Sequence, residues 1–373
     1  MRWHLSLASI LVAATVVAGC EEQKPTTMAP TASAPAGSTT AAAPTATTKV
    51  LAVLIDDEDL KSFKVLPAAF ESEKNPITEE KVTLGRMLFY ETRLSKNHDI
   101  SCNSCHDLEK YGVDNKKFSS GHKGQLGGRN SPTVYNSGGH VAQFWDGRAA
   151  TIEDQAKGPI LNAVEMAMPN EKRVITTLKS IPQYVELFKA AFPKDKDPIT
   201  YDNMASAIGA FERKLVTPSR FDKFLAGDKK ALTHLEQEGF QKFIKLGCTT
   251  CHVGPAVGAS TFQKLGLVKA YPDNSDLGRF AVTKLDADKM FFRVPSLRNV
   301  EKTGPYFHNG SITDLAVVVR TMADHQLGKE LKDDEVTMLV AFLKSLTGDI
   351  PTSYVKKPEL PPSTDKTPKA DPS

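Results

Sequence analysis

The sequence predicts an all-α protein with long loops, built from two related halves. Apolar side chains recur at helical spacing, as from Met204 to Leu215, and no segment sustains the strict alternation expected of a strand. Two blocks also recur at a similar offset: 129–132 (Arg-Asn-Ser-Pro) is echoed by 293–296, and 144–147 (Phe-Trp-Asp-Gly) by 307–310. Repetition of this kind indicates two copies of one structural unit.

Three further helices are predicted along the chain. An apolar face at 82–89 precedes a short cysteine motif. Residues 233–236 read Thr-His-Leu-Glu, a capping box that opens a helix running through Ile244. A last apolar stripe at 336–343 stops near Gly348, because glycine favours the left-handed conformation after a helix end.

Two cysteine motifs, at 102–106 and 248–252, each spell Cys-x-x-Cys-His. This is the attachment signal for a c-type haem. The thiols form thioethers with the haem vinyl groups, and the histidine offers a ring nitrogen to the iron. The sequence therefore predicts two covalently bound haem c groups, attached and ligated by Cys102, Cys105, His106, Cys248, Cys251 and His252.

Two other interpretations fit these cysteines less well. A lone Cys-x-x-Cys occurs in thioredoxin-like redox sites, but those lie in a βαβ pattern, which we do not find. Two such pairs could also bind zinc, but a zinc site does not require histidine directly after each second cysteine. The motifs use four of the five cysteines, so no pair is left to form an internal disulfide.

The composition describes a globular protein without a nucleic-acid function. The chain has 373 residues, enough for two domains, and a hydrophobic content of 40% that suits a soluble globular protein. Lys and Arg number 47 against 44 Asp and Glu, a formal net charge of +3 without any basic tract. This balance gives no argument for nucleic-acid binding.

The N-terminus is predicted to be an export signal. Arg2 precedes an apolar run too short to span a bilayer, so we assign residues 1–19 to a signal peptide. The run ends in Val-Ala-Gly-Cys, which resembles the lipobox of bacterial lipoproteins and implies a lipid anchor at Cys20. The alternative is an ordinary signal peptide with a stray cysteine. Residues 20–55, mostly Ala, Thr and Pro, are predicted to form a flexible linker in the periplasm between the lipid anchor at Cys20 and the folded part of the protein.

We place a first haem domain at 56–217 and a second at 218–350, with the boundary in the loop after Leu215. The proline-rich tail, 351–373, is predicted to be disordered. What faces each iron opposite its proximal histidine decides the function. Methionine there favours electron transfer at high potential, whereas an open or displaceable position permits chemistry.

The sequence resembles the bacterial di-haem cytochrome c peroxidases from about Phe70 to Gly348. The most specific matching blocks are 129–136, 144–149, 158–160 with 164–166, and 303–310. This resemblance implies two cytochrome c-like domains. It also implies a peroxidatic, low-potential haem in the first domain and an electron-transferring, high-potential haem in the second.

Three residues match the family's catalytic positions. His122, in a glycine-rich loop, matches a distal histidine that caps the first iron at rest and leaves when the second haem is reduced. Some members of the family rest with this loop already open. Glu165 matches the acid/base, which must move a proton from one peroxide oxygen to the other. Gln155 matches the amide that orients peroxide or water.

At the second haem, Met322 matches the distal iron ligand, and Met290 is the alternative sulfur. His308 matches a further histidine near this haem, to which we assign a supporting role. Trp145 matches a tryptophan between the haems that assists electron transfer; the alternative is a packed aromatic at the domain interface. Four other histidines are expected to be structural or solvated: His98, His140, His234 and His325.

The resemblance further implies a calcium ion between the haem domains, with oxygen ligands from Asn130, Thr303 and Pro305. It predicts a homodimer that reduces hydrogen peroxide to water, using electrons from a cytochrome c or a cupredoxin. Two alternatives stay open. One is a related di-haem oxidase of a protein or organic substrate, against which Met322 argues. The other is a non-enzymatic electron carrier with two six-coordinate irons.

Overall fold

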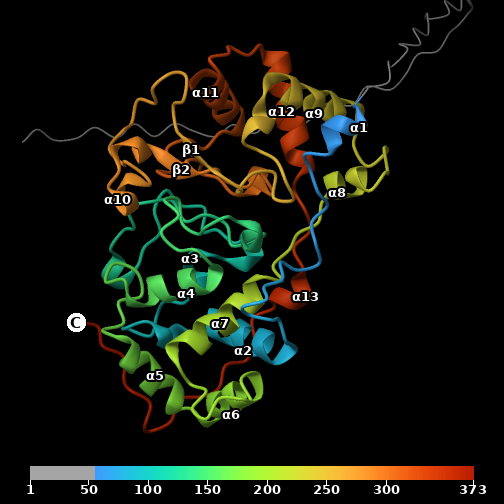
Figure 1. Ribbon diagram of the computed structural model, residues 1–373. Helices are drawn as coiled ribbons and strands as arrows, with labels where there is room; N and C mark the ends of the chain where they lie inside the picture. The colour runs from blue at the N-terminus through green and yellow to red at the C-terminus, as the bar shows by residue number, and fades with distance from the viewer. Residues whose placement is uncertain (1–54) are drawn as a thin grey trace, which may run out of the picture. The chain divides into compact units, whose positions relative to one another are not determined.

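A computed structural model describes residues 55–373, which belong to one compact unit. Residues 1–54, with the predicted signal peptide, Cys20 and nearly all of the linker, lie outside the described residues. Figure 1 shows a largely helical arrangement, as predicted. The described helices are α1 (Asp57–Leu60), α2 (Glu79–Phe89), α3 (Cys102–Cys105), α4 (Ile152–Leu161), α5 (Glu171–Lys179), α6 (Pro182–Ala191), α7 (Tyr201–Glu212), α8 (Arg220–Leu225), α9 (His234–Leu246), α10 (Phe280–Thr283), α11 (Leu315–Leu327), α12 (Asp333–Ser345) and α13 (Thr352–Val355).

The predicted helices are confirmed with small shifts at their ends. The apolar face at 82–89 lies in α2, and Val82, Leu84 and Leu88 are buried there. The capping box opens α9: Thr233 Oγ1 accepts a hydrogen bond from the Glu236 amide, and Glu236 Oε2 accepts one from the Thr233 amide. Within the described residues, no helix is long and apolar enough to cross a membrane.

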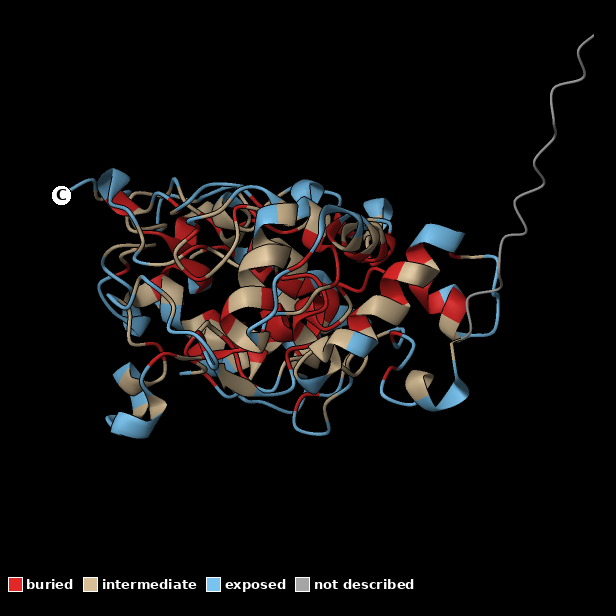
Figure 2. Cartoon of the chain, turned by 90° about the horizontal axis from the view of Figure 1, so that it is seen from above, coloured by how far each residue is buried: buried red, intermediate tan, exposed pale blue. Residues whose placement is uncertain are grey.

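Each of the two hydrophobic cores is built on a close crossing of two helices, and the two crossings have the same form. In the first core α2 packs on α7 at Gly85, where an added Cβ would lie 1.9 Å from the carbonyl oxygen of Ala207. In the second core α9 packs on α12 at Gly239, where an added Cβ would lie 1.9 Å from the oxygen of Met338. Figure 2 shows buried residues on the inward helix faces and exposed residues on the outer loops. The repeated crossing supports the inference of two copies of one unit.

One small sheet departs from the helical pattern. β1 (Phe262–Lys264) pairs antiparallel with β2 (Phe291–Arg293), with Phe262 opposite Arg293. Leu265, Met290 and Phe292 form a third, small cluster beside it. Three-residue strands are too short to show a period-two pattern, which explains why the sequence did not predict them.

The prediction of a disordered tail at 351–373 is wrong for the structure. After α13 the chain runs along the first core, past α6 and α5 to the point marked C in Figure 1. Side chains of the body donate to its carbonyls, as when Tyr90 Oη bonds to Val355 O at 2.6 Å and Arg93 Nη2 to Pro361 O at 2.8 Å. A proline-rich segment makes few hydrogen bonds of its own, so composition gave no sign of partners supplied by the body.

The glycine crossing can be tested by stability. Gly239→Ala places a methyl group against the Met338 backbone, so we expect the free energy of unfolding to fall by about 1–3 kcal/mol. Gly158→Ala is the matched control in α4, where the nearest atom to an added Cβ is 3.5 Å away. That change should be neutral or stabilise by about 0.5–1 kcal/mol, measured by denaturant unfolding. Equal effects of the two substitutions would contradict the close crossing.

Candidate functional site

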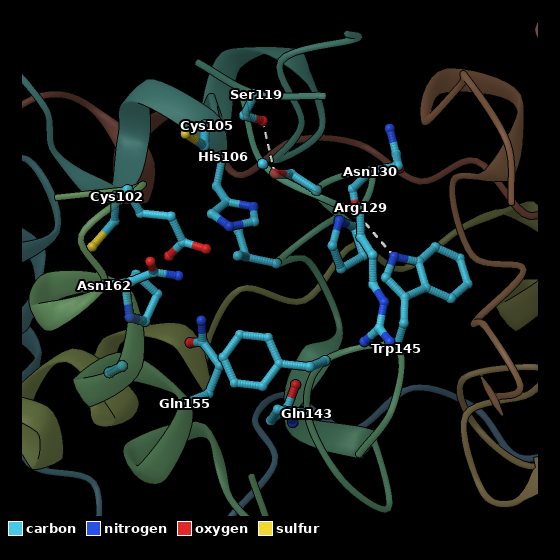
Figure 3. A pocket seen from close by; sticks show the side chains of 18 of the residues that line it. Cys102, Cys105, His106, Ser119, Arg129, Asn130, Gln143, Trp145, Gln155 and Asn162 are labelled. Atoms are coloured by element: carbon cyan, nitrogen blue, oxygen red, sulfur yellow. Dashed lines mark hydrogen bonds between the residues drawn. The ribbon is translucent and has the colours of Figure 1, made fainter. Parts of the chain in front are cut away.

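A cavity of about 630 Å³ lies beside the first Cys-x-x-Cys-His motif. Cys102, Cys105 and His106 line it, and so do Gln155 and Glu165. Figure 3 shows the His106 ring entering the cavity from one side and the Gln155 amide from the other. The first motif and two of the three predicted catalytic residues therefore come together around one space.

Local backbone structure presents His106 to this cavity. Ser101 caps α3, with its amide donating to Ser104 Oγ at 3.0 Å, and the His106 amide closes the turn on Cys102 O at 2.9 Å. His106 Nδ1 lies 3.3 Å from Gly112 O, so Nδ1 is the donor and Nε2 carries the free lone pair. Burial lowers the pKa of His106. The neutral imidazole is the form that binds a metal.

The second motif repeats this arrangement. His252 Nδ1 lies 3.3 Å from Val257 O, and burial lowers the pKa of His252 to about 4. Cys248 and Cys251 are unpaired and half-buried, as are Cys102 and Cys105. Each of the two sites therefore has the same components: a pair of free thiols and a neutral histidine oriented by a backbone carbonyl.

The polar groups around the first cavity fit a haem with its two carboxylates. Arg293 is only 2% exposed, and among the described residues it forms no ion pair; its guanidinium reaches only the carbonyls of Phe144 and Val294, at 3.3 and 3.4 Å. Burial lowers the pKa of Arg293 to about 10, so it remains charged at neutral pH. Both ring nitrogens of His140 are buried without a hydrogen-bond partner. An anion in the cavity would satisfy these groups.

Other cations at the cavity are already neutralised. Arg129 Nη1 pairs with Asp146 at 2.6 Å and Arg129 Nε with Asp276 at 2.6 Å, and Arg148 pairs with Asp146 at 3.2 Å. Arg293 is therefore the cavity-lining arginine that has no counter-ion among the described residues. The sequence repeat singled out its position, but pairing cannot be read from sequence, and His140 was assigned no site role.

Two carboxyl groups line the cavity: Glu165 is half-buried and Glu212 is buried. Burial raises the pKa of Glu165, opposed by the charge of Arg148 and a hydrogen bond from Asn162. Burial, reinforced by Glu153, raises the pKa of Glu212 to about 8. Glu212, on α7, is therefore neutral at pH 7, and the sequence analysis missed it because a lone glutamate in a helix has no signature.

His122 does not line the cavity. It begins a short 3₁₀ turn, His122–Gly124, and its backbone amide donates to Glu165 O at 2.8 Å. The ring is buried and turned to the tail, with Nε2 3.2 Å from the backbone oxygen of Ser373. Ligation of the first iron by His122 therefore stays a prediction that this conformation does not display.

Trp145 connects the first cavity to the small cluster that holds the candidate sulfurs of the second site. It lines the first cavity and packs against the cluster of Leu265, Met290 and Phe292, which Met322 of α11 also contacts. Its Nε1 donates to Asn130 O at 2.9 Å, and its own backbone oxygen accepts from the Arg293 amide at 2.8 Å. Both candidate sulfurs for the second iron thus share one cluster.

Two other histidines near this cluster have structural contacts. His308 stacks on Phe292 with ring centroids 4.2 Å apart. His325 Nδ1 lies 2.9 Å from Lys269 O. The supporting role of His308, whose Nε2 is buried without a hydrogen-bond partner, and the structural role of His325 stay predictions.

The predicted calcium positions lie where two loops meet. The Asn130 amide donates to His308 O at 2.8 Å, and Asn115 Nδ2 donates to Gly304 O at 2.9 Å and to Lys302 O at 3.3 Å. These bonds bring the loop that carries Thr303 and Pro305 beside the segment that carries Asn130. The Asn130 side chain donates through Nδ2 to Lys116 O, at 2.9 Å.

Comparison with known proteins agrees with this arrangement. The family model for di-haem cytochrome c peroxidase matches residues 79–230. Cytochrome c551 peroxidase of Pseudomonas aeruginosa is 46% identical over 331 residues, which cover 87% of this chain and 94% of the relative. Cytochrome c551 peroxidase of Nitrosomonas europaea is 50% identical over 301 residues, covering 80% and 88%.

A solved structure extends the likeness to the fold. The crystal structure of a MauG-like protein associated with microbial copper homeostasis superposes with a TM-score of 0.70 at 31% identity. The match covers 79% of this chain and 97% of that one. From the paired Cys-x-x-Cys-His sites, the fold and these relatives, the chain belongs to the di-haem cytochrome c peroxidase family.

Proposed function

We propose that this protein reduces hydrogen peroxide to water with electrons from a small redox protein, a cytochrome c or a cupredoxin. The observation that carries the proposal is that a neutral, oriented His106 and a half-buried carboxyl group, Glu165, line one cavity. The overall balance is one peroxide, two electrons and two protons giving two water molecules. The names of the curated relatives support this substrate and this kind of donor.

Each first-site residue has a defined task in this scheme. Cys102 and Cys105 would hold the first haem c, and His106 Nε2 would bind its iron; that group would supply the redox chemistry for cleavage of the O–O bond. Glu165, as carboxylate, accepts the proton from the peroxide oxygen nearer the haem and returns it to the departing oxygen. Gln155 orients the peroxide by hydrogen bonds. Arg293 and His140 bind the haem carboxylates.

The second half would supply the electrons. Cys248, Cys251 and His252 would hold the second haem c, and Met322 would supply a sulfur ligand to its iron. Met322 shares its cluster with Trp145, and Trp145 lines the first cavity, which gives a packed route between the sites. This asymmetry, a sulfur ligand in one half and a carboxyl group in the other, favours a peroxidase over a carrier. The same methionine argues against the di-haem oxidase alternative.

The remaining expectations concern calcium binding, oligomeric state and cellular location. Calcium would bind at the meeting of the Asn130 segment with the Thr303 and Pro305 loop and hold the two halves in register; the bonds from Asn115 support the closeness of these loops. We also propose a periplasmic homodimer, anchored by a lipid at Cys20. The export motif and the redox chemistry of haem attachment support that address.

The role of Glu165 predicts a specific pH dependence. Its raised pKa means that the carboxylate, the form able to accept a proton, appears above the ordinary glutamate pKa of about 4.3. Turnover should therefore rise with pH through that raised value. Glu165→Gln should lower kcat/KM by about 10²–10⁴ and abolish this limb, measured with reduced cytochrome c as donor.

Glu212→Gln provides the matched control in the same cavity. Glu212 is already neutral below pH 7, so the amide should behave like the native acid in that range, with turnover near that of the unmodified protein. Haem spectra should be unchanged in both variants. A Glu165→Gln protein with native turnover would remove Glu165 from the mechanism.

Binding of a haem carboxylate by Arg293 predicts a shift in potential. Reduction adds negative charge at the iron, and a nearby buried cation favours it. Arg293→Met should therefore lower the midpoint potential of the first haem, on the order of 60 mV for a tenfold change in a one-electron equilibrium. Spectroelectrochemical titration measures it. Arg293→Lys should keep most of the potential, and Arg86→Met, distant from the cavity lining, should leave it unchanged; an unaltered potential in Arg293→Met contradicts the assignment.

A further inference from the structure

We propose that the tail segment, residues 361–373, acts with Lys96 to position His122 outside the first cavity, which leaves the iron face open in the fully oxidised protein. The inference rests on the proposed function and concerns the regulation of the same site. Lys96 is a positioning residue, since it acts through the tail and His122 and does not line the cavity.

The contact that carries the proposal is made by the ring of His122. Its Nε2 lies 3.2 Å from a main-chain oxygen of Ser373, the last residue, and a carboxylate oxygen only accepts hydrogen bonds. Nε2 must therefore carry a proton and donate. A protonated ring nitrogen has no lone pair to offer, so this contact and coordination of an iron through Nε2 exclude each other.

Lys96 joins the tail to the same region. Its Nζ donates to Ser373 O at 2.8 Å and to Ser373 Oγ at 3.1 Å, and lies 3.6 Å from the Asp371 carboxylate. Its backbone oxygen accepts from the Asp371 amide at 2.9 Å. Its backbone amide donates at 2.8 Å to Met166 O, next to Glu165, whose own oxygen accepts from the His122 amide. Lys96 thus contacts Ser373, which meets the His122 ring, and Met166, whose neighbour Glu165 accepts from the His122 amide.

Several independent hydrogen bonds hold the tail against the rest of the protein upstream of this contact. Arg93 donates to Pro361 O at 2.8 Å and to Ser363 Oγ at 3.0 Å. Ser180 Oγ donates to Thr367 Oγ1 at 2.9 Å, and Arg173 Nη2 donates to Lys369 O at 2.8 Å. Prolines through the segment restrict its unbound conformations, so less entropy is lost when it lies down on the body.

The His122 turn is closely fitted in this position. An added Cβ at Gly121 would lie 1.9 Å from Val164 O, so the turn packs directly on the backbone that leads to Glu165. By contrast, Gly124 has no neighbour within 4 Å of an added Cβ, and Gly127 and Gly128 are equally open or nearly so. The loop therefore packs tightly toward Glu165 at Gly121 and is unconfined at Gly124, whereas Gly127 and Gly128 line the cavity itself.

The test removes the tail's last contacts and leaves the upstream ones. Three forms of the holoprotein are compared: the full chain, a form ending at Lys369, and Lys96→Met. Electron paramagnetic resonance and optical spectra report the spin state of the first ferric haem, with the second haem as internal reference. The full chain should be high-spin at the first haem. Both variants should become low-spin, with at least a tenfold slower reaction of the oxidised protein with peroxide.

Two further variants separate positioning from loss of structure. Lys96→Arg keeps a donor in place and should restore the high-spin signal, and His122→Ala in the form ending at Lys369 should do the same by removing the competing ligand. Lys179→Met, an exposed lysine paired with Asp197, is the control and should match the full chain. A low-spin first haem in the oxidised full chain, or a high-spin one in both Lys96→Met and the shortened form, overturns the proposal.

The result is independent of the proposed activity. If the spin state shifts as expected but no form reduces peroxide, the positioning role stands and the peroxidase function fails. If all forms reduce peroxide with one unchanging spin state, the function stands and the positioning role fails.

Discussion

Direct contact between helix backbones is the constraint on which the rest of this structure depends. At Gly85 and again at Gly239, two helices approach so closely that no side chain fits between them. In the second half α9 ends at Leu246, directly before the motif that begins at Cys248. In the first half α2 ends at Phe89, and a short connecting segment leads to the motif at Cys102. Bulky apolar residues then fill the space around each crossing, notably Phe211 in one core and Phe342 in the other.

On this shared scaffold the two halves differ in charge. Burial keeps His106 and His252 neutral, and a backbone carbonyl orients each ring. The cavity beside the first motif is lined by an unpaired arginine, Arg293, and by two carboxyl groups of raised pKa. A buried cation without a counter-ion is costly, and a group that brings negative charge into the cavity offsets that cost. The chemistry proposed for the first site thus follows from the polar groups around its cavity that lack a partner within the described residues.

How far the sequence predicted this arrangement depends on the range of the interactions. The capping box at Thr233 and the apolar face of α2 are local, and both were confirmed. The haem motifs are local as well. The solitary charge of Arg293 is not, because Phe144 and His140 approach it from distant parts of the chain. The placement of the tail failed for the same reason: its partners, Arg93 and Arg173, lie far away in sequence.

The wall of the first cavity has a consequence for how the chain can be divided. Ala281, Val282 and Arg293 belong to the second half of the sequence, yet they line the cavity of the first. Asp276 likewise completes the ion pair of Arg129. A fragment cut near residue 217 would therefore leave this cavity open to solvent on one side. The first half is thus not a self-sufficient module.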